Sequence, residues 1–222
     1  VQPLFIYAVP IRRIPRAGPR PGPQRGRPDL PRRVPRTRIH AITMAVMTEH
    51  VEHGFGPVWD AESRVLVLGS MPSPKSREAS FYYMHPRNRF WPVMAAVFAD
   101  PADPEDLPGD TPDSRRAFAL RHGIALWDVI AECDIDGASD ASIANAVPND
   151  PVPLIRGSRI ALVATTGAKA TQLYRRLCTP LLERAGISVP HVGLPSTSPA
   201  NAAMSLDRLI AAYREVLTPT GR

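Results

Sequence analysis

The sequence predicts an α/β domain built as a three-layer α/β/α sandwich around a central four-stranded parallel sheet. Two observations lead to this fold class. The candidate strands are continuous apolar runs, which is typical of parallel strands that are buried on both faces. Helical segments separate these runs along the chain, as expected where crossover helices cover both faces of a sheet.

The first apolar run is VLVL at residues 65–68. A helix is expected over 89–98. Thr111 and Pro112 then mark the N-cap and first position of a helix that ends near Gly123. The second run is GIALWDVI at 123–130, in which Asp128 is interpreted as a cap for the segment that follows. The stretch 134–153 is polar and turn-rich.

The third and fourth strands are SRIALVAT at 158–165 and ISVPHVG at 187–193. Gly167 opens the helix between them, and a last helix follows the loop LPSTSPAN. Each helix has one apolar face at helical spacing. These faces are Ala170, Leu173, Tyr174 and Leu177 in the first, and Leu206, Leu209, Ile210, Tyr213 and Leu217 in the second. Because such sheets bind ligands beyond the carboxyl ends of their strands, loops 69–89, 165–169 and 193–202 should converge there.

The net charge of +6 belongs to one end of the chain. Residues 1–43 contain ten arginines, nine prolines and a single acid, Asp29, whereas the remaining residues carry 17 basic and 20 acidic side chains. A segment so poor in apolar residues is expected to stay disordered. The sequence therefore predicts a tail over 1–46 and a single domain over 47–218.

Two hypotheses account for the tail. It is either a basic arm that holds DNA phosphates without sequence preference, or an upstream extension from a misplaced start codon. The chain begins with Val1 and has methionines at Met44 and Met47, which favours the second hypothesis. No stretch approaches the roughly 20 apolar residues of a membrane span, so we expect a soluble, cytoplasmic protein, associated with the nucleoid if prokaryotic.

The residues available for cofactor or covalent chemistry are few. Cys133 and Cys178 are far apart and show no metal-binding spacing, so they are interpreted as reduced, buried thiols, and neither a metal nor a cofactor is expected. Lys75 and Lys169 are the only lysines. A Schiff-base mechanism would have to use one of them.

Two strings carry the chemistry. GSMPSPKSREASFYYMHPRNRFW (69–91) directly follows the first buried strand, and LPSTSPAN (194–201) precedes the last helix. Together they resemble the hypoxanthine-DNA (deoxyinosine) glycosylase branch of the uracil-DNA glycosylase superfamily, over about residues 50–218. The related mismatch-specific uracil glycosylases share an HPxNRFW string, so the superfamily is assigned more firmly than the branch.

The resemblance implies a monofunctional DNA glycosylase of base excision repair. Such an enzyme flips a deaminated base, here hypoxanthine, out of double-stranded DNA and hydrolyses its N-glycosidic bond to leave an abasic site. It needs no cofactor, and we expect a monomer without a membrane partner.

The departures from the uracil enzymes locate the catalytic group. Those enzymes have an Asp or Asn that positions water where this sequence has Met71, and a His where it has Leu194; His191 lies three residues too early to replace it. Asn88, which the resembling hypoxanthine branch uses, is therefore the expected catalytic residue. The alternative is that Asn88 only caps the helix that begins at Arg89.

The remaining site residues fall into two sets. One of two adjacent tyrosines is expected to stack on the flipped base and the other to be core, while Phe90 and Trp91 are assigned to packing. The expected base-binding residues are Gly69, Ser70, Met71, Pro72, Tyr82, Tyr83 and His85. The expected DNA-binding residues are Ser73, Lys75, Lys169, Ser196, Thr197, Ser198, Pro199 and Ala200.

Several alternatives stay open. TTGAK (165–169) lacks the full phosphate-loop spacing and is interpreted as a turn whose amides approach DNA, while Asn149 and Asp150 are interpreted as a turn. A uracil or mismatch glycosylase would release uracil instead of hypoxanthine. A non-catalytic lesion-binding protein would release no base, and a nucleoside hydrolase would act on free deoxyinosine.

Overall fold

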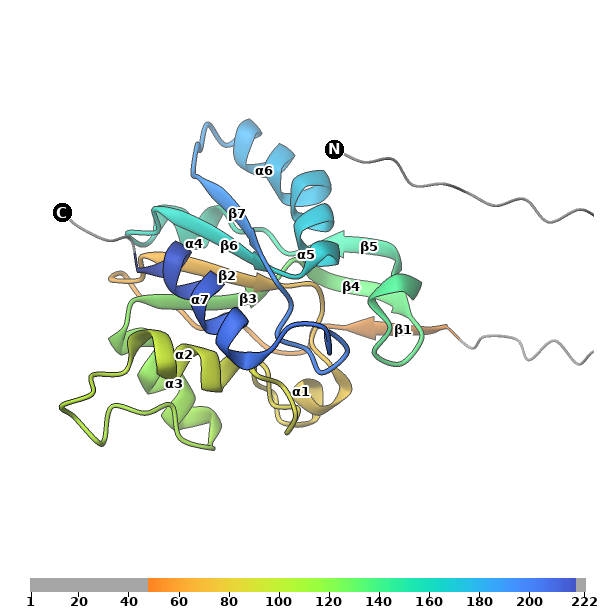
Figure 1. The fold of residues 1–222 in the computed structure, drawn as a ribbon. Helices are drawn as coiled ribbons and strands as arrows, with labels where there is room; N and C mark the ends of the chain where they lie inside the picture. Colours follow the sequence, from red (N-terminus) through yellow and green to blue (C-terminus); the bar gives the residue numbers. More distant parts are fainter. Residues whose placement is uncertain (1–47, 219–222) are drawn as a thin grey trace, which may run out of the picture. The chain divides into compact units, whose positions relative to one another are not determined.

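The computed structural model describes residues 48–218 (Figure 1); the predicted tail, 1–46, lies outside them. The strands are β1 (Glu49–Glu52), β2 (Val65–Gly69), β3 (Ile124–Asp128), β4 (Ile130–Ile135), β5 (Ala144–Pro148), β6 (Leu162–Thr166) and β7 (His191–Leu194). The helices are α1 (Pro74–Glu78), α2 (Phe90–Phe98), α3 (Pro112–Arg121), α4 (Val152–Arg156), α5 (Ala168–Leu173), α6 (Thr179–Arg184) and α7 (Leu206–Leu217), with a 3₁₀ turn η1 (Asp140–Ser142) and a π-helical turn η2 (Tyr174–Cys178).

The central sheet has four parallel strands in the order β3-β2-β6-β7. This arrangement confirms the predicted four-stranded parallel sheet. Its register places Gly69 beside Asp128 and Thr166 beside Leu194, so the carboxyl ends of all four strands lie at one edge.

Alternate residues of the central strands feed two apolar cores, which makes the domain three-layered. Val67, Leu126 and Ala164 pack with α2, α3 and α7. Leu66, Ala125 and Val163 face the other way and pack with α4, η2 and α6. Figure 1 shows α2, α3 and α7 on one side of the sheet and α5 and α6 on the other. The three-layer sandwich is therefore confirmed.

The helix starts follow the expected signals. Thr111 accepts a hydrogen bond from the N–H of Ser114 and begins α3, while Ser205 does the same for α7 with Arg208. On α7, Leu209, Tyr213 and Leu217 are buried, but Leu206 is 40% exposed. The predicted apolar stripe is thus wrong at its first residue, which lies in the solvent-facing first turn.

The stretch 134–153 differs most from its polar, turn-rich reading. It contains the end of β4 and all of β5, which form a second, antiparallel sheet in the order β1-β4-β5. The expected strand 123–130 ends at Asp128, because the N–H groups of Val129 and Ile130 bond instead to the carbonyls of Gly69 and Ser70. The fourth strand begins at His191 and not at Ile187.

The second sheet matters because it extends beyond the carboxyl edge of the central one. The N–H of His53, just after β1, donates to the carbonyl of Ala131 in β4. The end of β1 is thereby held close to the junction between β3 and β4. Within residues 48–218, we find no helix with the length and apolar character that crossing a membrane requires.

Candidate active site

One cavity of about 880 Å³ lies at the carboxyl edge of the central sheet. Residues from loops 69–89 and 193–202 form most of its wall, joined by Thr166 and by residues that follow β4. The lining comprises Gly69, Ser70, Met71, Pro72, Ser73, Ser76, Tyr82, Tyr83, His85, Arg87, Asn88, Asp128, Ile135, Ala138, Ser139, Asp140, Thr166, Ser196, Thr197, Ser198, Pro199, Ala200 and Asn201. The three loops expected to converge do meet here.

Most of the residues expected at the site line this cavity, including Asn88 and the whole base-binding set. The two lysines do not. Lys75 lies on α1 and pairs with Glu78 at 2.7 Å between Nζ and Oε2, with both side chains exposed. Lys169 is half-buried at the start of α5 and is also absent from the cavity wall.

The first loop is held by short-range bonds. The Ser73 hydroxyl accepts from the N–H of Ser76 and begins α1, and Arg77 donates to the carbonyl of Pro72. The Ser70 hydroxyl donates to the Asp140 carboxylate at 2.7 Å. This last bond ties the strand-end turn to the loop that follows β4.

The two tyrosines have different surroundings. Tyr82 is 2% exposed, and its hydroxyl donates to the carbonyl of Gly56 at 2.9 Å. Burial raises the pKa of this phenol well above its usual range. Tyr83 has a backbone φ of +55° and stacks one ring face on Phe90, with the ring centroids 3.7 Å apart. The left-handed backbone at Tyr83 is uncommon for a bulky residue and turns this ring toward the cavity.

Asn88 immediately precedes α2. Its side-chain carbonyl accepts from the N–H of Phe90 at 2.9 Å, while Arg89 occupies the N-cap position. The amide therefore supports the start of the helix, as one hypothesis held, and lines the cavity, as the other required. With the carbonyl bound to Phe90, the NH₂ group makes no hydrogen bond within the described chain and is free to donate to a ligand.

Arg89 holds the second motif in place. Its guanidinium donates to the carbonyls of Thr197, Ser198, Asn201 and Met204, and its backbone N–H donates to Thr197 as well. A planar guanidinium has donors enough for several acceptors at once. The first motif therefore determines the conformation of the loop supplied by the second.

TTGAK also serves the second motif. Gly167 has a φ of +95°, and a Cβ there would lie 3.1 Å from that of Ser196. The N–H of Gly167 donates to the carbonyl of Leu194. This turn thus fits closely against the 194–201 loop.

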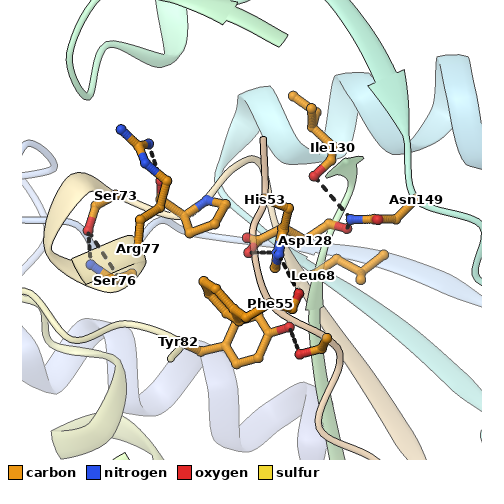
Figure 2. Close-up of polar contacts among 12 residues, drawn as sticks. His53, Phe55, Leu68, Ser73, Ser76, Arg77, Tyr82, Asp128, Ile130 and Asn149 are labelled. Carbon is orange, nitrogen blue, oxygen red and sulfur yellow. Dashed lines mark hydrogen bonds and ion pairs between the residues drawn. The ribbon is translucent and has the colours of Figure 1, made fainter. Parts of the chain in front are cut away.

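A buried pair behind the cavity was not identified from the sequence. Nε2 of His53 lies 2.9 Å from Oδ2 of Asp128, and both side chains are about 5% exposed. The Asn149 amide donates to the carbonyls of Asp128 and Ile130, so it braces the strand junction (Figure 2). Asp128 was interpreted only as a cap, and no local signal links it to a histidine 75 residues earlier.

Other polar groups do not reach the cavity. His191 lies at the start of β7, where its Nε2 is 3.0 Å from the Thr165 hydroxyl, and burial lowers its pKa. Cys133 and Cys178 are free and buried, as predicted. Burial raises the pKa of the Cys178 thiol to about 12. In the part of the chain that the structure describes, the cavity is lined by hydroxyl, amide, carboxylate and aromatic groups, without lysine or cysteine.

Comparison with solved structures identifies the class. A solution structure of a candidate uracil DNA glycosylase from Methanosarcina acetivorans matches with a TM-score of 0.56 and 29% identity, over 73% of this chain and 96% of that one. The fold and the cavity at its sheet edge therefore define an α/β/α protein of the uracil-DNA glycosylase superfamily.

Curated relatives identify the family. A hypoxanthine DNA glycosylase from M. acetivorans is 31% identical over 165 residues, which is 71% of this chain and 93% of the relative. Another, from Methanosarcina barkeri, is 34% identical over 92 residues, 41% of this chain and 55% of that protein. No protein-family model matches. The chain belongs to the hypoxanthine DNA glycosylase family.

Proposed function

We propose that this chain is a monofunctional DNA glycosylase that hydrolyses the N-glycosidic bond of deaminated bases, chiefly hypoxanthine, and leaves an abasic site. The observation that carries the proposal is that the two motifs of this family member form one cavity, with Asn88 in its wall. The cavity volume of about 880 Å³ is ample for a flipped purine nucleotide.

The reaction requires support for separated charge. As the C1′–N9 bond breaks, its electron pair leaves with the base, the sugar becomes positive, and water then adds to C1′. A fixed donor near the base stabilises the developing anion. The NH₂ group of Asn88 is such a donor, because its carbonyl is already fixed by Phe90. The second lone pair of that carbonyl can still orient the attacking water.

The aromatic wall supports base binding. Phe90 covers one face of the Tyr83 ring, and the other face is assigned to the flipped base. Stacking on an aromatic ring accepts any base and excludes water from its surface. Tyr83 is thus proposed as the stacking residue, and Tyr82 as core.

The second motif is proposed to contact the duplex. Loop 196–200 borders the cavity and is suited to pressing into the minor groove and filling the place of the flipped nucleotide. Arg87, which was not predicted, is exposed at the cavity wall and can meet a phosphate. We propose damaged double-stranded DNA as substrate, a monomer as the active form, no cofactor, and the prokaryotic cytoplasm as the place of action.

Base release from labelled duplexes tests this function. Each duplex contains one hypoxanthine, one uracil or one thymine mismatch, and alkali cleaves the abasic products. We expect release of hypoxanthine above the other bases and none from free deoxyinosine. Damage-specific binding without release would identify a lesion-binding protein instead, and preferred release of uracil would identify a uracil glycosylase.

A further inference from the structure

We propose that Asp128, supported by His53, recognises the ring N–H that deamination creates. This inference rests on the proposed function and names the contact that selects its substrate. Asp128 would touch the base, whereas His53 would act through Asp128 as a positioning residue.

The position of Asp128 suits a base contact. It ends β3 and lines the cavity. Its Oδ2 faces His53, while Oδ1 makes no hydrogen bond within residues 48–218. A Cβ on Gly69 would lie 2.2 Å from Oδ1, so only glycine leaves room for the carboxylate at this place. One oxygen is therefore anchored and the other is available at the cavity floor.

The hydrogen bonds of His53 show that this pair holds an additional proton. Nδ1 lies 2.7 Å from the carbonyl of Phe55, which can only accept, so Nδ1 carries a hydrogen. A neutral ring would then turn the lone pair of Nε2 toward the Asp128 carboxylate. The 2.9 Å contact requires a proton between them. The pair is thus an imidazolium with a carboxylate, or its neutral equivalent, with no net charge (Figure 2).

An acceptor at Oδ1 distinguishes deaminated bases from their parents. Adenine has a lone pair at N1, and hypoxanthine has N1–H; cytosine has a lone pair at N3, and uracil has N3–H. An acceptor facing a lone pair leaves both groups unpaired in a buried site, which strongly disfavours the parent base. The same oxygen accepts from the N–H of either product. One contact therefore reads the chemical change that deamination makes.

His53 solves an electrostatic problem for this contact. The departing base carries negative charge, and a bare carboxylate beside it would oppose bond cleavage. The shared proton cancels that charge while Oδ1 remains an acceptor. Tyr82, Tyr83 and Asp140 also face Asp128. Burial raises the pKa of both phenols, so Asp140 is the neighbour whose titration needs a control.

Two substitutions at one position separate recognition from structure. Asp128→Leu keeps the size but removes the acceptor, and hypoxanthine release should fall about 10- to 100-fold, the cost of one unpaired polar group. Asp128→Asn should keep both contacts. Its NH₂ can donate to Nε2 of a neutral His53, and its carbonyl then replaces Oδ1 toward the base.

The pH profile gives a readout that a purely structural role would not change. Wild-type release should fall on the alkaline side, where the pair loses its proton. Asp128→Asn should show the opposite profile, because a protonated His53 claims the Asn carbonyl and turns the NH₂ toward the base N–H. Asp140→Asn is the matched control and should keep the wild-type profile.

Single-turnover release across pH, with thermal melting of each protein, decides the proposal. A folded Asp128→Leu as active as wild type, or an Asp128→Asn with the wild-type pH profile, would overturn it. If Asp128→Leu does not fold, the Asp128→Asn profile decides alone. If wild type releases uracil but not hypoxanthine, the proposed substrate fails while the same variants, scored on uracil, still test Asp128.

Discussion

Adjacent residues of one type can have opposite roles when the backbone turns between them. Tyr82 and Tyr83 are equivalent in the printed sequence, and the sequence predicted one core and one stacking residue without choosing. The positive φ at Tyr83 turns its ring out of the core that holds Tyr82. Such a conformation depends on the folded loop, so the sequence could not provide it.

Tyr83 can be tested against its neighbour. Tyr83→Leu removes the stacking face and should slow hypoxanthine release about 10- to 100-fold, as expected from base stacking of about 1–3 kcal/mol. Tyr83→Phe keeps the ring and should remain close to wild type. Tyr82→Phe loses a buried hydrogen bond to Gly56 and should lower the melting temperature with little change in the release rate. Equal rates for Tyr83→Leu and wild type would remove Tyr83 from base binding.

Residue-level prediction succeeded where a motif carried the information. Asn88 and the base-binding set lie in strings that resemble a known family, and the structure brings them to one cavity. Asp128 and His53 lie in no such string. Their contact depends on β1 pairing with β4, a long-range event with no local signature.

At the scale of elements, Arg89 connects the two motifs. Arg89→Lys replaces a guanidinium that contacts four carbonyls by an ammonium that cannot span them. We expect a loss of about 2 kcal/mol in unfolding free energy, since hydrogen bonds to charged groups contribute about 1.5–3 kcal/mol. Amide exchange in 195–204 should accelerate.

The matched control is Arg214→Lys, because Arg214 donates to a single carbonyl, that of Ala96, from an exposed position. It should change the unfolding free energy little. Similar losses for the two arginine variants would show that Arg89 has no special part in holding the 195–204 loop.

The connection between α2 and α3 has a pH-dependent anchor. The Asp106 carboxylate accepts from the N–H of Asp100, from Arg121 and from His122. The hydrogen bond from Asp100 is the first cause that lowers the pKa of this carboxyl below its usual value of 3.8. Its contribution to stability is therefore complete above that value and is lost as pH falls through the lowered pKa.

Asp106→Asn should accordingly lower the melting temperature at neutral pH. The difference from wild type should shrink as the solution is acidified below about pH 4, where the wild-type carboxyl also loses its charge. Melting curves over this range provide the measurement. A difference that stays constant with pH would mean that the charge of Asp106 does not stabilise the fold.

The elements predicted correctly were those with a strong local pattern. The four central strands, α2, α3 and α7 have continuous apolar runs, amphipathic faces or capping residues. β5 reads ANAVP and is mostly exposed at a sheet edge, so it has neither kind of signal. The boundary between β3 and β4 comes from backbone bonds to Gly69 and Ser70, which are distant in the chain.

At the scale of the whole molecule, charge is divided unevenly between tail and domain. Residues 44–222 have three more acids than bases, while residues 1–43 have an excess of nine positive charges. If the tail takes part in binding, the full chain should bind duplex DNA more tightly than a chain that begins at Met47. Each extra phosphate contact should steepen the plot of log affinity against log salt by about 0.9. Equal slopes would exclude the tail from binding.

Hypoxanthine release by wild type and Asn88→Ala tests the central claim most directly. The substitution removes both the free NH₂ group and a helix-start bond, so Thr111→Ala, which loses the cap of α3 away from the cavity, is the matched control for stability. We expect wild type and Thr111→Ala to release hypoxanthine and folded Asn88→Ala to be at least about 100-fold slower, the effect of one transition-state donor. A folded Asn88→Ala as fast as wild type would contradict the assignment of this cavity's chemistry to Asn88.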